Sequence, residues 1–164
     1  MPAEEQIKKR VMPYSLDAEQ AVIGAMISDK DAIVTATELL TSDDFYGKQN
    51  GIIFDAIVEL YDRGSVPDVI PLQNKLKEKG IPDEINNIEY LGGLVADTNS
   101  SLIRDFCNIL IEKSTLRKMI KINEGIANAC YEGKQDYNSL LEETEKKVFD
   151  LVQSRKISSH MPID

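Results

Sequence analysis

The sequence has no tryptophan, one histidine and only two cysteines in 164 residues. A zinc site of the usual kind needs several histidine or cysteine ligands at short spacing, and this chain does not offer them. Cys107 and Cys130 fall on one expected helix, about 35 Å apart along its axis, so they cannot pair if that helix is intact. We therefore expect no metal site, and two buried thiols in a reducing compartment.

Long hydrophobic runs are also missing. No apolar stretch approaches the roughly 18 residues that a membrane-spanning helix requires, and the charged start lacks the core of a signal peptide. Hydrophobic residues still make up 42% of the chain while aromatic residues make up 6%, which favours an aliphatic core. We expect a cytoplasmic protein that does not use a membrane as its partner.

The motifs of enzymatic chemistry are absent as well. A phosphate-binding Walker A loop needs a glycine, four residues, and then Gly-Lys-Ser/Thr. Gly47-Lys48 and Gly133-Lys134 are each followed by glutamine and lack the upstream glycine, so both are interpreted as turns. Paired carboxylates fall in expected caps, loops or exposed faces: Asp43-Asp44, Asp83-Glu84 and Glu142-Glu143. We predict no catalytic residue and no cofactor in this segment, and the missing nucleophile–base pair disfavours a small helical enzyme.

Helical periodicity is what the sequence does contain, and no segment shows sustained strict alternation. After a flexible tail over 1–12, residues 13–101 predict a compact helical head. Its expected helices are one capped by Ser15 and running to about Ile27, then 31–40, 48–63, one capped by Asp68 and running to 79, and 88–96. The predicted fold class is all-α.

Residues 102–152 predict a long antiparallel helical hairpin. The first helix is expected over about 102–131, where Gly133 supplies a left-handed terminator, and Asp136 caps the second helix, which runs to about Val152. Early apolar residues of the first helix lie nearly opposite its later ones. Either the helix breaks near Ser114 or one helix changes partners; the second is favoured, since glycine and proline are absent nearby. Residues 153–164 read as the start of a linker in a longer protein.

The hairpin carries more apolar surface than two helices packed only on each other can cover. A four-helix bundle, formed by hairpins from two copies, is the simplest arrangement that would bury it. We therefore expect self-association.

Charge is distributed unevenly along the chain. The net charge is −9, but residues 13–100 hold 16 acids against 6 bases while residues 101–152 hold 9 against 8. An acidic head is a poor binder of phosphate backbones. Four basic residues share one face of the first hairpin helix: Lys113, Arg117, Lys118 and Lys121. That face is either solvated or a docking strip for an acidic partner or nucleic acid.

Several segments, in order and with the expected spacing, resemble the N-terminal part of the bacterial replicative DNA helicase, DnaB. They are SLDAEQAVIGAMI over 15–27, DDFY over 43–46, IFDAI over 53–57, LYDRG over 60–64, VPD over 66–68, YL over 90–91 and IEKSTLR over 111–117. The resemblance covers about residues 12–152. It departs from the family pattern at Ser15, where the family usually has asparagine, and at Thr98-Asn99-Ser100, where Val-Pro-Ser is frequent.

The resemblance implies a homohexameric, ATP- and Mg-dependent helicase that encircles single-stranded DNA, with a C-terminal RecA-like motor absent here. The N-terminal parts of that helicase form a collar, a trimer of hairpin dimers, which receives the DnaG primase; a helicase loader is a further implied partner. On that reading the paired hairpin face includes six residues, whose positions come from periodicity: Leu116, Ile120, Ile126, Leu141, Val148 and Val152. Primase contact would fall on the hairpin and its turn, around Tyr131 to Asn138, with Tyr131 and Tyr137 as docking residues.

One alternative remains open in the binding class. The chain could be a free-standing helical oligomerisation or adaptor module with no attached motor. A Walker motif further along the same reading frame would distinguish the two, since only the helicase reading requires one. On either reading this segment alone is expected to bind single-stranded DNA weakly or not at all.

Overall fold

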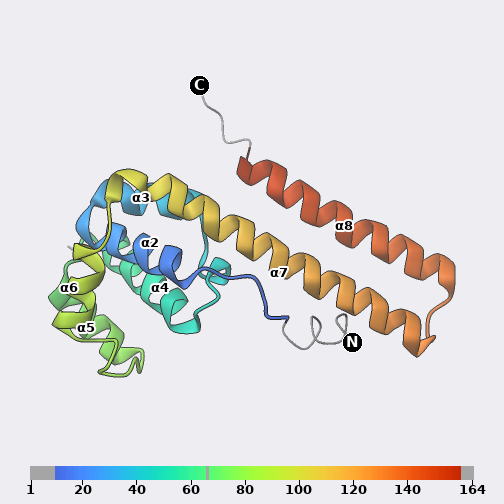
Figure 1. Ribbon diagram of the computed structural model, residues 1–164, viewed down its shortest axis with the longest axis horizontal. Helices are drawn as coiled ribbons and strands as arrows, with labels where there is room; N and C mark the ends of the chain where they lie inside the picture. Colours follow the sequence, from blue (N-terminus) through green and yellow to red (C-terminus); the bar gives the residue numbers. More distant parts are fainter. Residues whose placement is uncertain (1–9, 66, 160–164) are drawn as a thin grey trace. The chain divides into compact units, whose positions relative to one another are not determined.

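The computed structural model describes residues 10–65 and 67–159, and every regular element among them is helical, which confirms the predicted all-α class (Figure 1). The chain divides into two compact units. One, the head, comprises Tyr14–Ser114, and the other comprises residues 115–164 together with the segment before Tyr14. The division falls inside a helix rather than in a loop, thirteen residues after the expected end of the head.

The head contains five α-helices and two short 3-10 turns. They are α2 (Leu16–Ser28), α3 (Lys30–Leu39), η1 (Ser42–Asp44), α4 (Lys48–Asp62), α5 (Val69–Glu78), α6 (Ile88–Ala96) and η2 (Ser100–Leu102). The helical hairpin, which starts in the head and ends in the second unit, consists of α7 (Ile103–Glu132) and α8 (Tyr137–Ser159). All five head helices lie within a few residues of their predicted bounds.

Short polar side chains begin these helices by satisfying free backbone N–H groups. Ser15 Oγ accepts from Ala18 N at 3.2 Å, and Asn87 Oδ1 accepts from Tyr90 N at 2.7 Å. Asp68 caps α5 as predicted, through a 2.8 Å bond from Val69 N. The helix starts are therefore encoded locally, which is why sequence alone located them.

An aliphatic core holds the head together, as the composition predicted. Its fully buried large side chains come from five helices and include Ile23, Met26, Ile33, Ile53, Ile57, Leu72, Leu76 and Leu91. Helix α2 lies against α6 so closely that a Cβ at Gly24 would stand 2.2 Å from the carbonyl oxygen of Leu94. A glycine is therefore required at this crossing.

A buried carboxylate fixes the segment that leads into α4. Glu19, 1% exposed, accepts hydrogen bonds from Tyr46 N at 2.8 Å, Gly47 N at 3.0 Å and Asn50 Nδ2 at 3.1 Å. These charge-assisted bonds compensate for the loss of hydration that burial imposes on the carboxylate.

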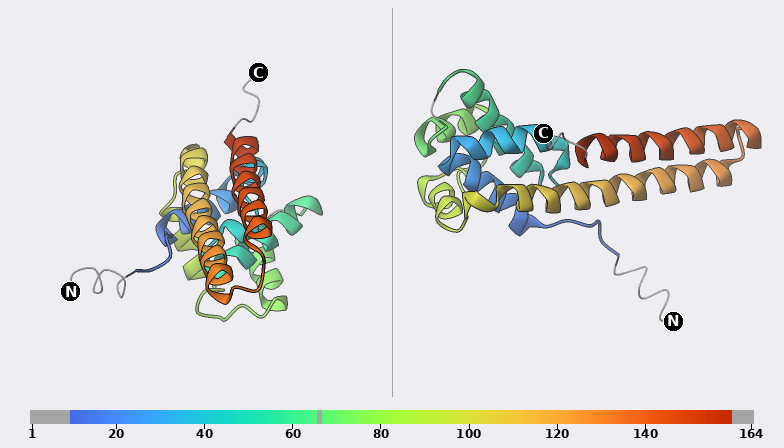
Figure 2. Two further views of the ribbon diagram at one scale, coloured as in Figure 1. Left: turned by 90° about the vertical axis from the view of Figure 1, so that its right-hand side faces the viewer. Right: turned by 90° about the horizontal axis from the view of Figure 1, so that it is seen from above.

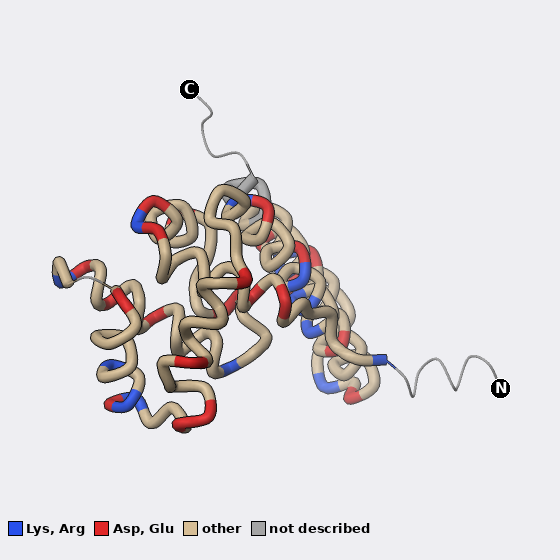
Figure 3. Tube along the Cα trace, turned by 60° about the vertical axis from the view of Figure 1, so that its left-hand side comes forward, with Lys and Arg blue, Asp and Glu red and all other residues tan. Residues whose placement is uncertain are grey.

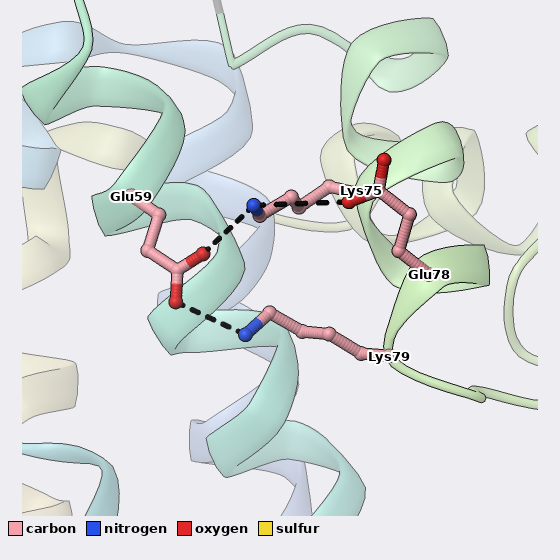
Figure 4. A network of polar contacts seen from close by, with 4 residues as sticks. All are labelled: Glu59, Lys75, Glu78 and Lys79. Carbon is pink, nitrogen blue, oxygen red and sulfur yellow. Dashed lines mark hydrogen bonds and ion pairs between the residues drawn. The ribbon is translucent and has the colours of Figure 1, made fainter.

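Helices α4 and α5 are joined at the surface of the head by an ion-pair network (Figure 4). The carboxylate of Glu59 lies 3.0 Å from Lys79 Nζ and 3.1 Å from Lys75 Nζ, and Lys75 Nζ also lies 3.8 Å from the carboxylate of Glu78. Hydrogen bonds from Lys79 and then Lys75 hold the pKa of Glu59 below its ordinary value.

Helix α7 is continuous from Ile103 to Glu132, so the favoured interpretation, one helix that changes partners, is confirmed. Its first turns belong to the head core, where Ile103, Cys107 and Leu110 are all buried. The prediction that both thiols are buried is wrong for Cys130, which is exposed. Cys130 lies on the same side of α7 as Leu116 and Met119, which are also exposed.

Helix α8 extends to Ser159, beyond the predicted end at Val152. Apolar periodicity fades after Val152, but no glycine or proline follows until Pro162, so nothing in the local sequence stops the helix. The rest of the expected linker, including His160, lies outside the described residues.

Candidate functional site

The part of the hairpin that lies in the second unit is built from residues 115–132 of α7 and from α8, which run side by side in opposite directions (Figure 2). Gly133 has φ of 63° and ends α7 as predicted, because glycine adopts this left-handed conformation without a steric penalty. Asp136 then caps α8 by accepting from Ser139 N at 3.2 Å. A hydrogen bond from the Ser139 side chain and, to a smaller extent, this backbone bond lower the pKa of Asp136.

A narrow seam of half-buried side chains joins the two helices. Ile122 and Ile126 of α7 belong to it, as do Leu140 and Leu151 of α8. Ile122 and Ile126 are four residues apart, and Leu140 and Leu151 are eleven residues, or about three turns, apart, so each pair marks one side of its helix. These residues define the direction in which each helix faces the other.

A second set of apolar side chains lies beside that seam on each helix, about 40–110° around the helix axis from its centre, at about 100° per residue. Its members are exposed: Leu116 38% and Met119 43% on α7, and Leu141 62%, Val148 44% and Val152 46% on α8. We call these five residues the apolar face.

The two halves of the apolar face point to the same side of the hairpin. On α7 the exposed set follows the seam in the direction of increasing helical angle, and on α8 it does the same. The helices are antiparallel, so when both are viewed along one axis, successive residues progress clockwise around one helix and anticlockwise around the other. Both rotations therefore lead to one common face, which carries uncovered aliphatic surface on both helices.

The six residues predicted to form the subunit interface occupy two positions in this geometry. Leu116, Leu141, Val148 and Val152 belong to the exposed apolar face. Ile120 is half-buried at its edge, and Ile126 lies mainly in the seam against α8. Their role in subunit pairing stays a prediction.

In the part of the hairpin that lies in the second unit, two exposed large apolar residues were not among the predicted site residues. Met119 belongs to the apolar face, and its position between Leu116 and Ile120 in the α7 pattern was sufficient to identify it. Phe149 is 58% exposed but lies away from the apolar face. Amphipathic periodicity could not single it out, because it stands alone on the polar side of α8.

The predicted basic strip is not a single exposed surface. Arg117 is only 8% exposed, and its guanidinium donates to the Pro13 carbonyl at 2.9 Å. Lys113 belongs to the head unit and is half-buried, whereas Lys118 and Lys121 are exposed. The four side chains therefore have different environments, and two of them remain accessible to a partner.

Two tyrosines flank the turn of the hairpin. Tyr131 is 90% exposed and Tyr137 is 73% exposed. Both are thus accessible, as a docking role at the turn would require, and that role stays a prediction.

Charges elsewhere give little support for a ligand site. Acidic residues outnumber basic ones along the head (Figure 3), and the hairpin carries an exposed pair in which Lys147 lies 3.0 Å from Glu143. This lysine lowers the pKa of Glu143. Within residues 10–65 and 67–159, no three His, Cys, Asp or Glu side chains gather as metal ligands would. None of the helices described there combines the length and apolar content needed to cross a bilayer.

Comparison with known proteins identifies the family. The model of the DnaB-like helicase N terminal domain matches residues 11–112, which include the whole head except its last two residues, Lys113 and Ser114. This chain belongs to that family. The replicative DNA helicase DnaB of Geobacillus stearothermophilus is 32% identical over 152 residues, which cover 92% of this chain and 34% of that protein. The DnaB helicase of Haemophilus influenzae is 33% identical over 154 residues, covering 93% and 33% respectively.

The same family relationship appears in three dimensions. The crystal structure of the N-terminal domain of DnaB helicase from Mycobacterium tuberculosis matches with a TM-score of 0.77 and 27% identity, covering 85% of this chain and 99% of that one. The chain spans about a third of the length of the curated DnaB relatives that it matches. Both findings confirm the resemblance on which the sequence interpretation was based.

Proposed function

We propose that this chain is the collar domain of a hexameric replicative DNA helicase, in which hairpins from two copies pair and the paired domains receive primase. The observation that supports pairing is the apolar face, because five exposed aliphatic side chains on one side of a hairpin need a cover that the hairpin does not supply. A second hairpin presents the same surface and completes a four-helix bundle.

The two-fold symmetry of such a pair fits the composition of the apolar face. An isologous contact uses the same patch on both copies, so the patch must be compatible with itself. Aliphatic side chains meet this requirement without charge repulsion. Three such pairs in a ring would give the trimer of dimers that the helicase family implies.

Motor activity is proposed only for a longer protein. ATP and Mg would bind in a C-terminal RecA-like domain, and single-stranded DNA would pass through the complete ring, with weak or no binding to this segment. The excess of acidic residues in the head supports weak or no DNA binding by this segment. The protein would act at the replication fork in the bacterial cytoplasm, with a helicase loader as a further partner.

Molar mass in solution tests the proposal directly. The 164-residue chain should sediment as a dimer or larger species at micromolar to millimolar concentration, and primase from the same organism should add mass to that species. A monomer at millimolar concentration would refute hairpin pairing. Dimers that do not bind primase would leave pairing intact and refute primase docking.

The second candidate is a helical adaptor without a motor, which the same apolar face also favours, since pairing does not require an ATPase. The coding sequence downstream of Asp164 separates the two. A RecA-like domain with a Walker A motif in the same reading frame supports the helicase collar, and its absence supports the adaptor.

A further inference from the structure

Phe149 is a large apolar side chain that the pairing of hairpins does not explain. It is 58% exposed, and it has no polar atom through which water could stabilise it there. On α8 it lies about 180° from the side that faces α7 and about 90° from the centre of the apolar face. It therefore points out of the hairpin, on the edge that α8 forms.

A four-helix bundle would leave Phe149 uncovered. Each helix of such a bundle contacts two neighbours that are about a quarter of a turn apart and uses the side between them for the core. For α8 these directions are the seam with α7 and the apolar face. Phe149 lies outside both, whereas Leu141, Val148 and Val152 lie within the half of α8 that the bundle would bury.

The surroundings of Phe149 are polar and mainly acidic. Glu145 and Lys146 stand one turn before it, Glu142 stands two turns before it on nearly the same line, and Gln153 stands one turn after it. These four side chains are all exposed. An apolar ring bordered by two carboxylates and one ammonium group favours a partner that carries a positive rim.

We infer that Phe149 anchors a second protein on hairpins that are already paired, and that this protein presents an apolar socket bordered by lysine or arginine side chains. The inference rests on the proposed function, in which the protein that docks is primase. Aromatic residues, phenylalanine among them, are enriched at protein–protein interfaces, where a few side chains buried in pockets of the partner contribute most of the binding energy. Tyr131 also points away from the apolar face, but its phenol can be hydrated at the tip of the hairpin, so its exposure needs no partner.

The test measures self-association and primase binding on the same variants. Phe149→Ala should leave the sedimentation behaviour of the 164-residue chain unchanged and weaken calorimetric binding of primase at least about tenfold. The matched control, Val148→Ala at the neighbouring position, should weaken self-association. Tyr131→Ala should affect primase binding less than Phe149→Ala does.

A second variant tests whether the acidic side chains around Phe149 are needed for primase binding. Replacing both Glu142 and Glu145 by glutamine should weaken primase binding and reduce its salt dependence, with self-association unchanged. Equal affinity of primase for wild type and Phe149→Ala would overturn the inference while leaving the collar proposal intact. If wild type self-associates but does not bind primase, the primase proposal fails and this inference fails with it. A loss of self-association in Phe149→Ala would refute the assignment of Phe149 to the outer edge.

Discussion

Leu141→Asp is the sharpest perturbation of the apolar face, because Leu141 is its most exposed member at 62%. Burying a whole leucine side chain contributes about 1.5–3 kcal/mol, so covering the exposed part of Leu141 would contribute about 1–2 kcal/mol per copy. An aspartate loses that term, and a carboxylate placed against apolar side chains costs about 1–3 kcal/mol more. Each change counts twice in a two-fold pair. The dissociation constant should therefore rise by about a thousandfold or more.

Sedimentation equilibrium from micromolar to millimolar concentration measures this constant, and far-UV circular dichroism checks that the variant keeps its helices. Gln153→Asp is the matched control, since it adds the same charge to the same helix at an exposed position away from the apolar face. The control should associate like wild type. If Leu141→Asp also does so while remaining helical, the apolar face is not the pairing surface, and the argument from uncovered aliphatic area is refuted.

Four further predictions concern the fold itself. Glu19→Gln should lower the free energy of unfolding in urea by about 2–3 kcal/mol, because an amide group cannot accept all three hydrogen bonds of the buried carboxylate. Gly24→Ala should lower the same free energy by at least about 2 kcal/mol, because the added methyl group meets a carbonyl of α6. Lys79 and Lys75 hold the pKa of Glu59 below its ordinary value of 4.5. The stabilisation that this carboxylate provides is therefore complete above pH 4.5 and is lost as the pH falls through its lower folded-state pKa. Glu59→Gln should abolish that acid-side loss, measured by thermal unfolding. A maleimide reagent should modify exposed Cys130 and leave Cys107 intact in the native chain, because burial raises the pKa of Cys107 to about 12; equal labelling rates would contradict the buried position of Cys107.

The parts of the fold that sequence predicted well are those determined by neighbouring residues. Helix starts followed from Ser15 and Asp68, whose side chains reach backbone groups one to three residues away. Gly133 predicted the end of α7, and Asp136 predicted the start of α8. Such signals are contained in a few residues, so no knowledge of tertiary structure was needed.

What sequence could not predict depends on the packing between distant segments. Arg117 shares a helical face with three lysines, but only the structure shows that it is buried and donates to Pro13. Glu19 was not singled out from the sequence, because the three groups that bind it are some 30 residues away in the chain. Cys130 fell on an apolar stripe and was expected to be buried, but one hairpin alone does not cover that stripe.

Helix α7 carries more exposed apolar surface than one partner helix can cover, and the positions of its apolar residues show why. Its early apolar residues lie nearly opposite its later ones: Leu110 and Met119, for example, lie about 180° apart around the helix, at about 100° per residue. Averaged over its whole length the helix therefore has almost no amphipathic character, yet each half alone has a clear apolar side. The first half is buried in the head. In the second half, one side of α7 forms the seam with α8. The adjacent side is apolar and exposed. A helix that needed only α8 would be polar at Leu116 and Met119, so the apolar side chains at these positions are best explained by a second hairpin.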